Sequence, residues 1–181
     1  MIPLSFRLRR EGYRTRFFGY SATLESMPRI VSRLIRTMQD IKPDIIISHS
    51  LGGVLSRMAL LESMPATLRH IVMLGTPNRS PRIARFCWNW FPFRAFSRSC
   101  GEFLSSPAAY ERLPVPTVPV TVIAGTSGPK YLFGEPNDGI VTVSETQLHP
   151  DCPSIALPGW HSLMMNSHAV QDAIFERIRK C

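Results

Sequence analysis

Residues 44–53 of this chain are Asp44-Ile45-Ile46-Ile47-Ser48-His49-Ser50-Leu51-Gly52-Gly53. The three consecutive isoleucines are typical of a strand buried on both faces of a parallel sheet. A helix is expected to begin directly after Ser50, which places this serine at the apex of a sharp turn, in a strained backbone conformation with its hydroxyl exposed.

The strand and the helix approach each other closely at such a turn, so small residues are expected two positions before and after the serine. Gly52 meets this requirement fully and Ser48 less well. The N–H of Leu51, at the start of the helix, is expected to stabilise a developing oxyanion. The stretch therefore predicts a nucleophile at Ser50; the alternative is a strand–turn–helix junction with a capping serine.

The composition is that of a folded globular protein. The 181 residues are 44% hydrophobic and 19% charged, which is enough chain for one domain with a sizeable core. The net charge of +8 permits attraction to anionic surfaces such as lipid head groups. No recognition-helix or base-stacking motif accompanies this charge, so nucleic acid is not an expected partner. The four cysteines show neither a C-x-x-C pair nor the spacing of zinc ligands, so no metal site is predicted.

The chain as given shows no signal for export. No apolar run is long enough to span a bilayer, and near the N-terminus the arginines follow the apolar residues, which is the reverse of a secretory signal. The compartment stays undetermined, with the cytoplasm as the default expectation.

Strands and helices are predicted to alternate through most of the chain. Helices are expected at residues 1–11, ended by Gly12, and at 27–40, 51–64 and 167–179. Strands are expected at residues 13–20, 44–48, 68–74, 120–124 and 155–157. This order predicts an α/β fold with a mostly parallel sheet and helices on both faces, formed by residues 1–181 as one domain.

Residues 79–114 interrupt this alternation with many aromatic residues and interleaved arginines. One interpretation is a lid over an apolar acyl pocket, with Trp88, Trp90 and Phe91 in contact with substrate. The other is a helical excursion whose aromatics complete the core. Trp160 is a further candidate for substrate contact.

A nucleophilic serine needs a base to take its proton and an acid to orient that base. Among the five histidines, His161 follows directly after the carboxyl end of a predicted strand, at the edge of the sheet where Ser50 is expected. Asp138 follows the loop that leaves the strand at 120–124 and is the candidate acid. Asp-Gly is also typical of a tight turn, and Glu135 and Asp151 are the alternative acids.

Four short motifs resemble those of the lipase- and esterase-like branch of the α/β-hydrolase family. Residues 48–53, S-H-S-L-G-G, look like its G-H-S-L-G-G elbow with serine in place of the first glycine. Residues 74–78, L-G-T-P-N, resemble the turn that follows the family's next strand. Residues 137–139, N-D-G, resemble the loop that carries its acid, and residues 161–163, H-S-L, resemble the loop that carries its histidine. The resemblance implies Ser50 as nucleophile, Asp138 as acid and His161 as base, in that family's chain order.

The resemblance also implies a strand that this sequence does not contain. In the family, a strand ending in a His-Gly turn precedes the helix that corresponds here to residues 1–11, and it lies between the strands corresponding to 13–20 and 44–48. Its turn supplies a second oxyanion N–H, and losing one such donor typically costs ~10²–10³ in turnover. We therefore expect an N-terminally shortened α/β-hydrolase fold. A stable, monomeric and fully active protein of 181 residues would contradict this.

The sequence thus predicts a serine hydrolase of carboxylic esters, of lipase or esterase type, that requires no cofactor. The expected partner is a small-molecule or lipid ester with an apolar acyl chain; peripheral membrane contact and the oligomeric state are left open. Two alternatives remain. One is a hydrolase-like protein that binds a lipid or a partner through residues 79–114 with little or no catalysis, and the other is an acyltransferase.

Overall fold

The computed structural model describes residues 2–88, 98–152 and 154–181. Its sheet has four parallel strands in the order β1-β2-β3-β4, which is also their order along the chain. The strands are β1 (Ile45–His49), β2 (His70–Leu74), β3 (Val120–Gly125) and β4 (Ile155–Leu157). Because all four run in the same direction, their carboxyl ends lie at one edge of the sheet, where ligands bind in open α/β sheets.

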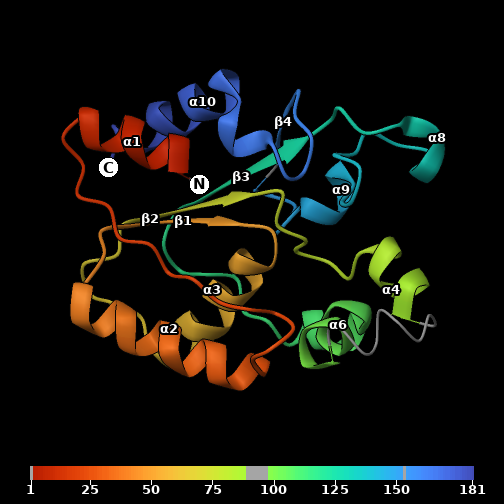
Figure 1. Ribbon diagram of the computed structural model, residues 1–181, viewed down its shortest axis with the longest axis horizontal. Coiled ribbons are helices and arrows are strands. Elements are labelled where there is room, and N and C mark those ends of the chain that lie inside the picture. Colours follow the sequence, from red (N-terminus) through yellow and green to blue (C-terminus); the bar gives the residue numbers. More distant parts are fainter. Residues whose placement is uncertain (1, 89–97, 153) are drawn as a thin grey trace.

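Helices cover both faces of the sheet (Figure 1). The helices α1 (Ile2–Arg10) and α10 (His168–Ile178) lie on one face, and α2 (Met27–Ile41) and α3 (Leu51–Glu62) lie on the other. The other helices of the described ranges are α4 (Arg82–Trp88), α6 (Arg98–Ser105), α7 (Pro107–Glu111), α8 (Lys130–Phe133), α9 (Val143–Thr146) and the 3-10 helix η1 (Met164–Asn166). The predicted α/β fold with a parallel sheet between helices is confirmed.

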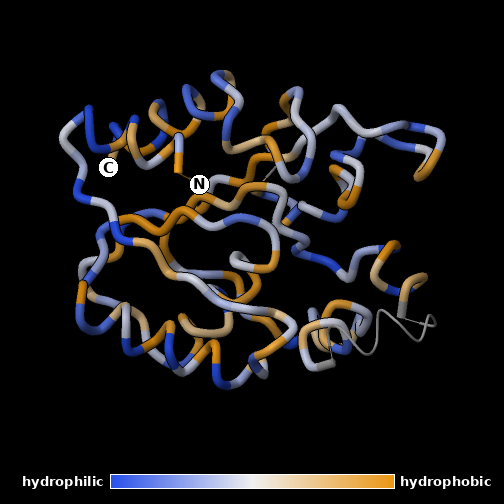
Figure 2. The backbone as a smooth tube through the Cα atoms, viewed as in Figure 1, coloured by the Kyte–Doolittle hydropathy of each residue, from blue (hydrophilic) through white to orange (hydrophobic). Residues whose placement is uncertain are grey.

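Two hydrophobic clusters hold these layers together. Ile71 and Met73 of β2 pack with α2 and α3, whereas Val72 and Leu74 of the same strand pack with α1 and α10. Successive strand residues point to opposite faces, so a strand covered on both sides must be apolar at every position. Hydrophobic residues accordingly run along the central strands (Figure 2).

Most of the predicted elements lie close to the observed ones. The helix expected at 27–40 is Met27–Ile41, with Pro28 in its first turn, and the strand expected at 155–157 is Ile155–Leu157. Gly12 follows α1 with a φ of +89°, a conformation that favours glycine at a helix end. None of the helices in the described ranges is long and apolar enough to cross a membrane.

The strand predicted at residues 13–20 is wrong. These residues are all described and form no strand. Within the described ranges, β1 pairs with β2 alone, and no strand forms a ladder with residues 13–20. Phe18 and Tyr20 instead pack against the cluster formed with α2 and α3, and Tyr13 packs against Phe175. Residue types that favour strands form one only where a neighbouring strand accepts their hydrogen bonds.

Among the described residues, β1 therefore has one edge without a paired strand. The Asp44 carbonyl accepts the Arg69 N–H at 2.8 Å, and the Ser50 N–H donates to the Leu74 carbonyl at 2.9 Å. Backbone groups of even-numbered residues thus face β2, whereas those of the odd-numbered residues of β1 face away from it. This open edge agrees with the expectation of a shortened fold.

Candidate active site

Ser50 lies between β1 and α3 with φ 53° and ψ −128°. A positive φ is uncommon for a residue with a side chain and is held only when the surroundings impose it. Here the Ser50 N–H donates to the Leu74 carbonyl, and the Ser50 carbonyl accepts the Gly53 N–H at 3.0 Å. The serine is therefore held on one side by β2 and on the other by the first turn of α3. Leu51 is the first residue of α3, where helix N–H groups have no partner within the helix.

The position near Ser50 that has no room for a side chain differs from the predicted one. Ser48 is accommodated because it is buried and its hydroxyl donates to the Val72 carbonyl at 3.3 Å. A Cβ atom on Gly52 would meet nothing closer than 3.8 Å, which is ordinary contact. A Cβ atom on Gly53 would lie 2.8 Å from the Cβ of Thr76 and closer still to its two γ atoms. The position that demands glycine is therefore Gly53 and not Gly52.

The three residues predicted to react together lie in one hydrogen-bonded chain. His161 Nε2 lies 2.8 Å from Ser50 Oγ, and His161 Nδ1 lies 2.7 Å from Asp138 Oδ2. His161 is 7% exposed and Asp138 is 1% exposed, so water screens their interaction little. In neutral His161, Nδ1–H donates to the carboxylate, which leaves Nε2 free to accept the serine proton.

The Asp138 carboxylate is fixed by its own loop. Its second oxygen, Oδ1, accepts the N–H groups of Ile140 at 3.0 Å and Val141 at 2.7 Å. The Asp138 carbonyl accepts the His161 N–H at 2.9 Å, so the acid also orients the backbone of the histidine. These contacts hold the carboxylate in one orientation beside His161.

Two neighbours with no assigned role in the sequence analysis support this loop. The Asn137 side chain donates to the carbonyls of Pro129 and Glu135 and accepts the Gly139 N–H at 2.9 Å. Gly75 has φ +52°, and a Cβ atom there would lie 3.0 Å from Asp138 Oδ2. Gly75 belongs to the L-G-T-P-N motif and Asn137 to the N-D-G motif. The sequence therefore marked both residues, but not the contacts that they make.

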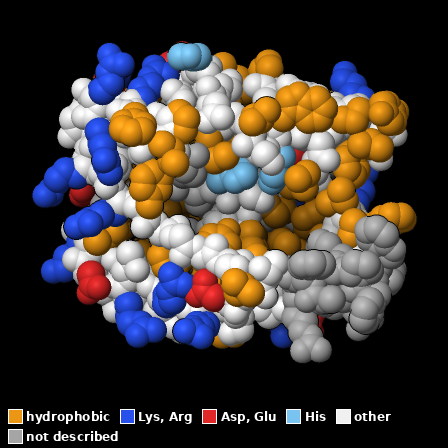
Figure 3. All heavy atoms as spheres, viewed as in Figure 1, with side chains coloured by type: hydrophobic (Ala, Val, Ile, Leu, Met, Phe, Trp, Pro, Cys, Tyr) orange, Lys and Arg blue, Asp and Glu red, His pale blue; other side chains and the backbone are white. Residues whose placement is uncertain are grey.

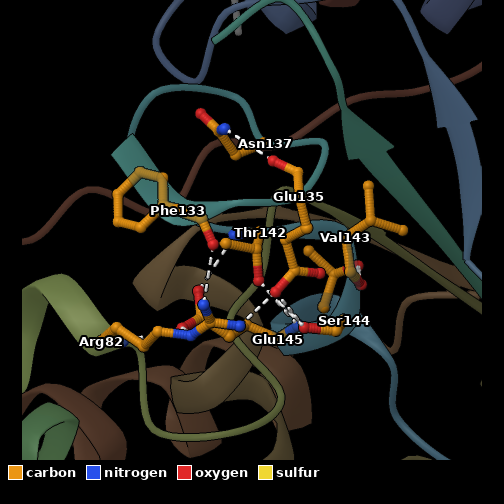
Figure 4. A network of polar contacts seen from close by, with 9 residues as sticks. Arg82, Phe133, Glu135, Asn137, Thr142, Val143, Ser144 and Glu145 are labelled. Atoms are coloured by element: carbon orange, nitrogen blue, oxygen red, sulfur yellow. Dashed lines mark hydrogen bonds and ion pairs between the residues drawn. The ribbon is translucent and has the colours of Figure 1, made fainter. Parts of the chain in front are cut away.

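The alternative acids lie elsewhere. Glu135 forms an ion pair with Arg82 and accepts the Ser144 hydroxyl at 2.9 Å (Figure 4). The Asp151 side chain is 91% exposed and lies 3.3 Å from His149. Neither interacts with His161, so Asp138 is the acidic residue that the structure brings to this histidine.

A polar network joins the acid loop to the turn after β2 (Figure 4). The Glu145 carboxylate accepts the Thr142 N–H at 2.9 Å and the Arg82 N–H at 2.7 Å. Its carbonyl accepts the Asn78 N–H at 2.8 Å. Thr142 and Glu145 form a capping box at the start of α9, a pattern that their T-x-x-E spacing gives in the sequence.

The aromatic candidates for substrate contact are only partly placed. Trp160 is 50% exposed next to His161, and its ring lies against Gly139. Trp90 and Phe91 lie outside the described residues, and α4 ends at Trp88.

A groove of about 310 Å³ lies beside the elbow. It is lined mainly by apolar side chains of residues 16–20, α2 and β1, together with three residues close to Ser50 in the chain: Ser48, His49 and Gly52. Figure 3 shows this face of the molecule hollowed where histidine side chains meet hydrophobic ones. The groove lies along the edge of β1 that has no paired strand in the described ranges, so local sequence patterns do not indicate it.

No protein-family profile matches this sequence, and no curated protein matches it. Solved structures do match. The propeptide form of the Bacillus licheniformis lipase BlEst2 gives a TM-score of 0.68 at 16% identity, over 97% of this chain and 45% of that chain. The phospholipase PlaB from Legionella pneumophila, in complex with thio-NAD, gives 0.60 at 16% identity, over 81% of this chain and 40% of that chain. A thermophilic esterase gives a TM-score of 0.55 at 16% identity, over 87% of this chain and 74% of that chain.

This chain thus spans less than half the length of the first two of these proteins. At such low identity, the likeness shows a shared fold. The chain has the α/β-hydrolase fold, as the sequence predicted.

Proposed function

We propose that this protein is a serine hydrolase of carboxylic esters, of the lipase or esterase type. One observation carries the proposal: the unbroken hydrogen-bonded chain from Ser50 Oγ through His161 to the buried carboxylate of Asp138. The strained turn at Ser50 adds support, because it exposes the hydroxyl at the edge of the sheet. The lipases and esterases among the structures with the same fold make ester cleavage the first activity to test.

The proposed reaction has two halves. Ser50 Oγ attacks the ester carbonyl carbon while its proton passes to His161 Nε2, and the negative charge on the carbonyl oxygen is stabilised by the Leu51 N–H. The C–O bond of the ester then breaks, and His161 returns the proton to the departing alcohol. Water attacks the acyl-serine in the same way and releases the carboxylic acid. Asp138 stabilises the imidazolium in both halves and stays ionised.

The surroundings of Ser50 favour an apolar acyl group. The groove begins at residues that flank the nucleophile and is lined further on by Phe17, Leu34 and Met38. Burial of an acyl chain there would contribute about 0.8 kcal/mol per methylene group. The exposed ring of Trp160 gives a second apolar surface beside His161.

A second candidate is a hydrolase-like protein with little or no turnover. The open edge of β1 favours it, because no strand of the described ranges lies beside this edge to add a second oxyanion donor to the Leu51 N–H. The site would then bind an ester or a lipid without cleaving it.

Labelling with a fluorophosphonate, read by intact mass, separates the two candidates without knowledge of the substrate. We expect one adduct per chain at Ser50, none in Ser50→Ala, and a collapse of the labelling rate in His161→Ala and Asp138→Asn. Circular dichroism of each variant checks that it is folded. A folded wild-type protein that takes up no label would reject the hydrolase and leave the binding protein.

A further inference from the structure

His49 joins the nucleophile turn to the loop that carries His161. Its Nε2 lies 2.8 Å from the backbone carbonyl of His161. The two imidazole rings lie 4.9 Å apart, tilted by 48°. His49 is the last residue of β1, so this bond ties the sheet to the histidine loop directly beside the reacting atoms.

The chemistry of this contact fixes the protonation of His49. A carbonyl oxygen only accepts hydrogen bonds, so Nε2 must carry the proton. Burial, with the nearby His161 as a second cause, lowers the pKa of His49 to about 4. His49 is therefore neutral at neutral pH, with its proton on Nε2. A neutral donor holds the carbonyl without adding a positive charge that would oppose the formation of the His161 imidazolium.

With this bond, His161 is fixed at four points. Asp138 accepts both its N–H, at 2.9 Å, and its Nδ1–H, at 2.7 Å. The consecutive residues His49 and Ser50 hold the opposite side, through the His161 carbonyl and Nε2. The backbone carbonyl sets where the ring stands relative to Ser50 Oγ, and small displacements of reacting groups lower rates strongly.

We propose that His49 is a positioning residue for the Ser50–His161 pair, acting through the His161 carbonyl. The inference rests on the proposed function. His49 is not itself a second base, because among the described residues neither of its ring nitrogens makes a hydrogen bond to Ser50, whose hydroxyl is paired with His161.

Two substitutions of His49 distinguish its hydrogen bond to the His161 carbonyl from its packing. The amide nitrogen of a glutamine reaches about where the imidazole Nε2 lies and donates a hydrogen bond, whereas leucine fills similar space without a donor. We expect His49→Leu to lower kcat and the fluorophosphonate labelling rate ~10- to 100-fold with little change in KM, because only the placement of the base changes. His49→Gln is expected to restore both to within a few fold. Equal activity of the two variants would overturn the proposal.

Should the leucine variant not fold, His49→Asn replaces it, since its amide is too short to reach the carbonyl. A second readout does not depend on turnover: long-range ¹H–¹⁵N correlation spectra of the Ser50→Ala protein report the histidine tautomers. We expect His49 with its proton on Nε2, as its contact with the His161 carbonyl requires. A His49 with its proton on Nδ1 would overturn the proposal. Because these spectra need no activity, they separate failure of this inference from failure of the proposed function.

Discussion

Gly53 and Thr76 are packed so closely that no Cβ atom fits on the glycine. The nearest approach would be to the γ atoms of Thr76, and its Cβ would lie at only 2.8 Å. Thr76 is fully buried in the turn after β2, and its β-branched side chain has few alternative rotamers. This contact packs the first turn of α3 closely against the turn after β2, and so fixes the position of Ser50 relative to the sheet.

Gly53→Ala should therefore be costly where Gly52→Ala is not. We expect Gly53→Ala to lower the free energy of unfolding by ~1–3 kcal/mol through overpacking. Gly52→Ala should change it little, or raise it by up to about 1 kcal/mol, because alanine favours a helix more than glycine does. Urea denaturation of the two variants measures the difference. Equal losses at both positions would contradict the packing described here.

Only one of three neighbouring acidic residues should matter for catalysis. Asp138→Asn is expected to lower the labelling rate of Ser50 by about 10⁴, because an amide no longer holds His161 in the productive tautomer. Glu135→Gln and Asp151→Asn should stay within a few fold of wild type, since neither side chain contacts His161. Labelling rates followed by intact mass give this comparison. A large loss in Glu135→Gln with an active Asp138→Asn would reverse the assignment of the acid.

The neutral state of His49 predicts how stability depends on pH. Its pKa is about 4 in the folded protein, and the ordinary value of 6.5 applies when the chain is unfolded. Between these values the unfolded chain binds a proton that the folded one does not, so stability falls as pH decreases from about 6.5 to about 4. The full contribution is on the order of 3 kcal/mol.

His49→Gln should remove this contribution and leave those of other groups, including His70, whose pKa is also lowered by burial. The free energy of unfolding is measured by urea denaturation at several pH values for both proteins. We expect the difference between them to move in favour of the variant as the pH falls. Parallel curves for the two proteins would show that His49 titrates normally.

The hydrogen bonds of Glu145 should contribute more to stability than the neighbouring, more exposed ion pair between Arg82 and Glu135. Glu145→Ala leaves the N–H groups of Arg82 and Thr142 without their carboxylate, and we expect a loss of ~2–3 kcal/mol. Glu135→Gln weakens an ion pair whose arginine side chain is 46% exposed, and such pairs contribute up to about 1 kcal/mol. Thermal unfolding of both variants tests this order. A larger loss in Glu135→Gln would contradict it.

The order of elements was accessible from the sequence, and so was the grouping of the residues proposed for the site, because each rests on local patterns. Runs such as Ile45–Ile47 indicate buried strands, and residues that follow parallel strands must meet at one edge of the sheet. That rule was enough to select His161 among five histidines and to prefer Asp138 as its partner.

What the sequence did not provide depends on contacts between distant segments. Residues 13–20 have the composition of a strand, but no strand of the described ranges pairs with them. The glycine requirement moved from Gly52 to Gly53 because Thr76, 23 residues further along the chain, occupies the space. The bond from His49 to His161 joins residues 112 positions apart. Local spacing contains no information on any of these three.

The unpaired edge of β1 also affects how the protein will behave in solution. Its outward-facing N–H and C=O groups form a template for another strand, and Ile45–His49 contains neither the lysine nor the proline that protects many such edges. The net charge of +8 keeps copies of the chain apart through mutual repulsion, and salt screens that repulsion. The purified protein should therefore stay dispersed best at low ionic strength, and light scattering should rise with added salt before any change in its secondary structure.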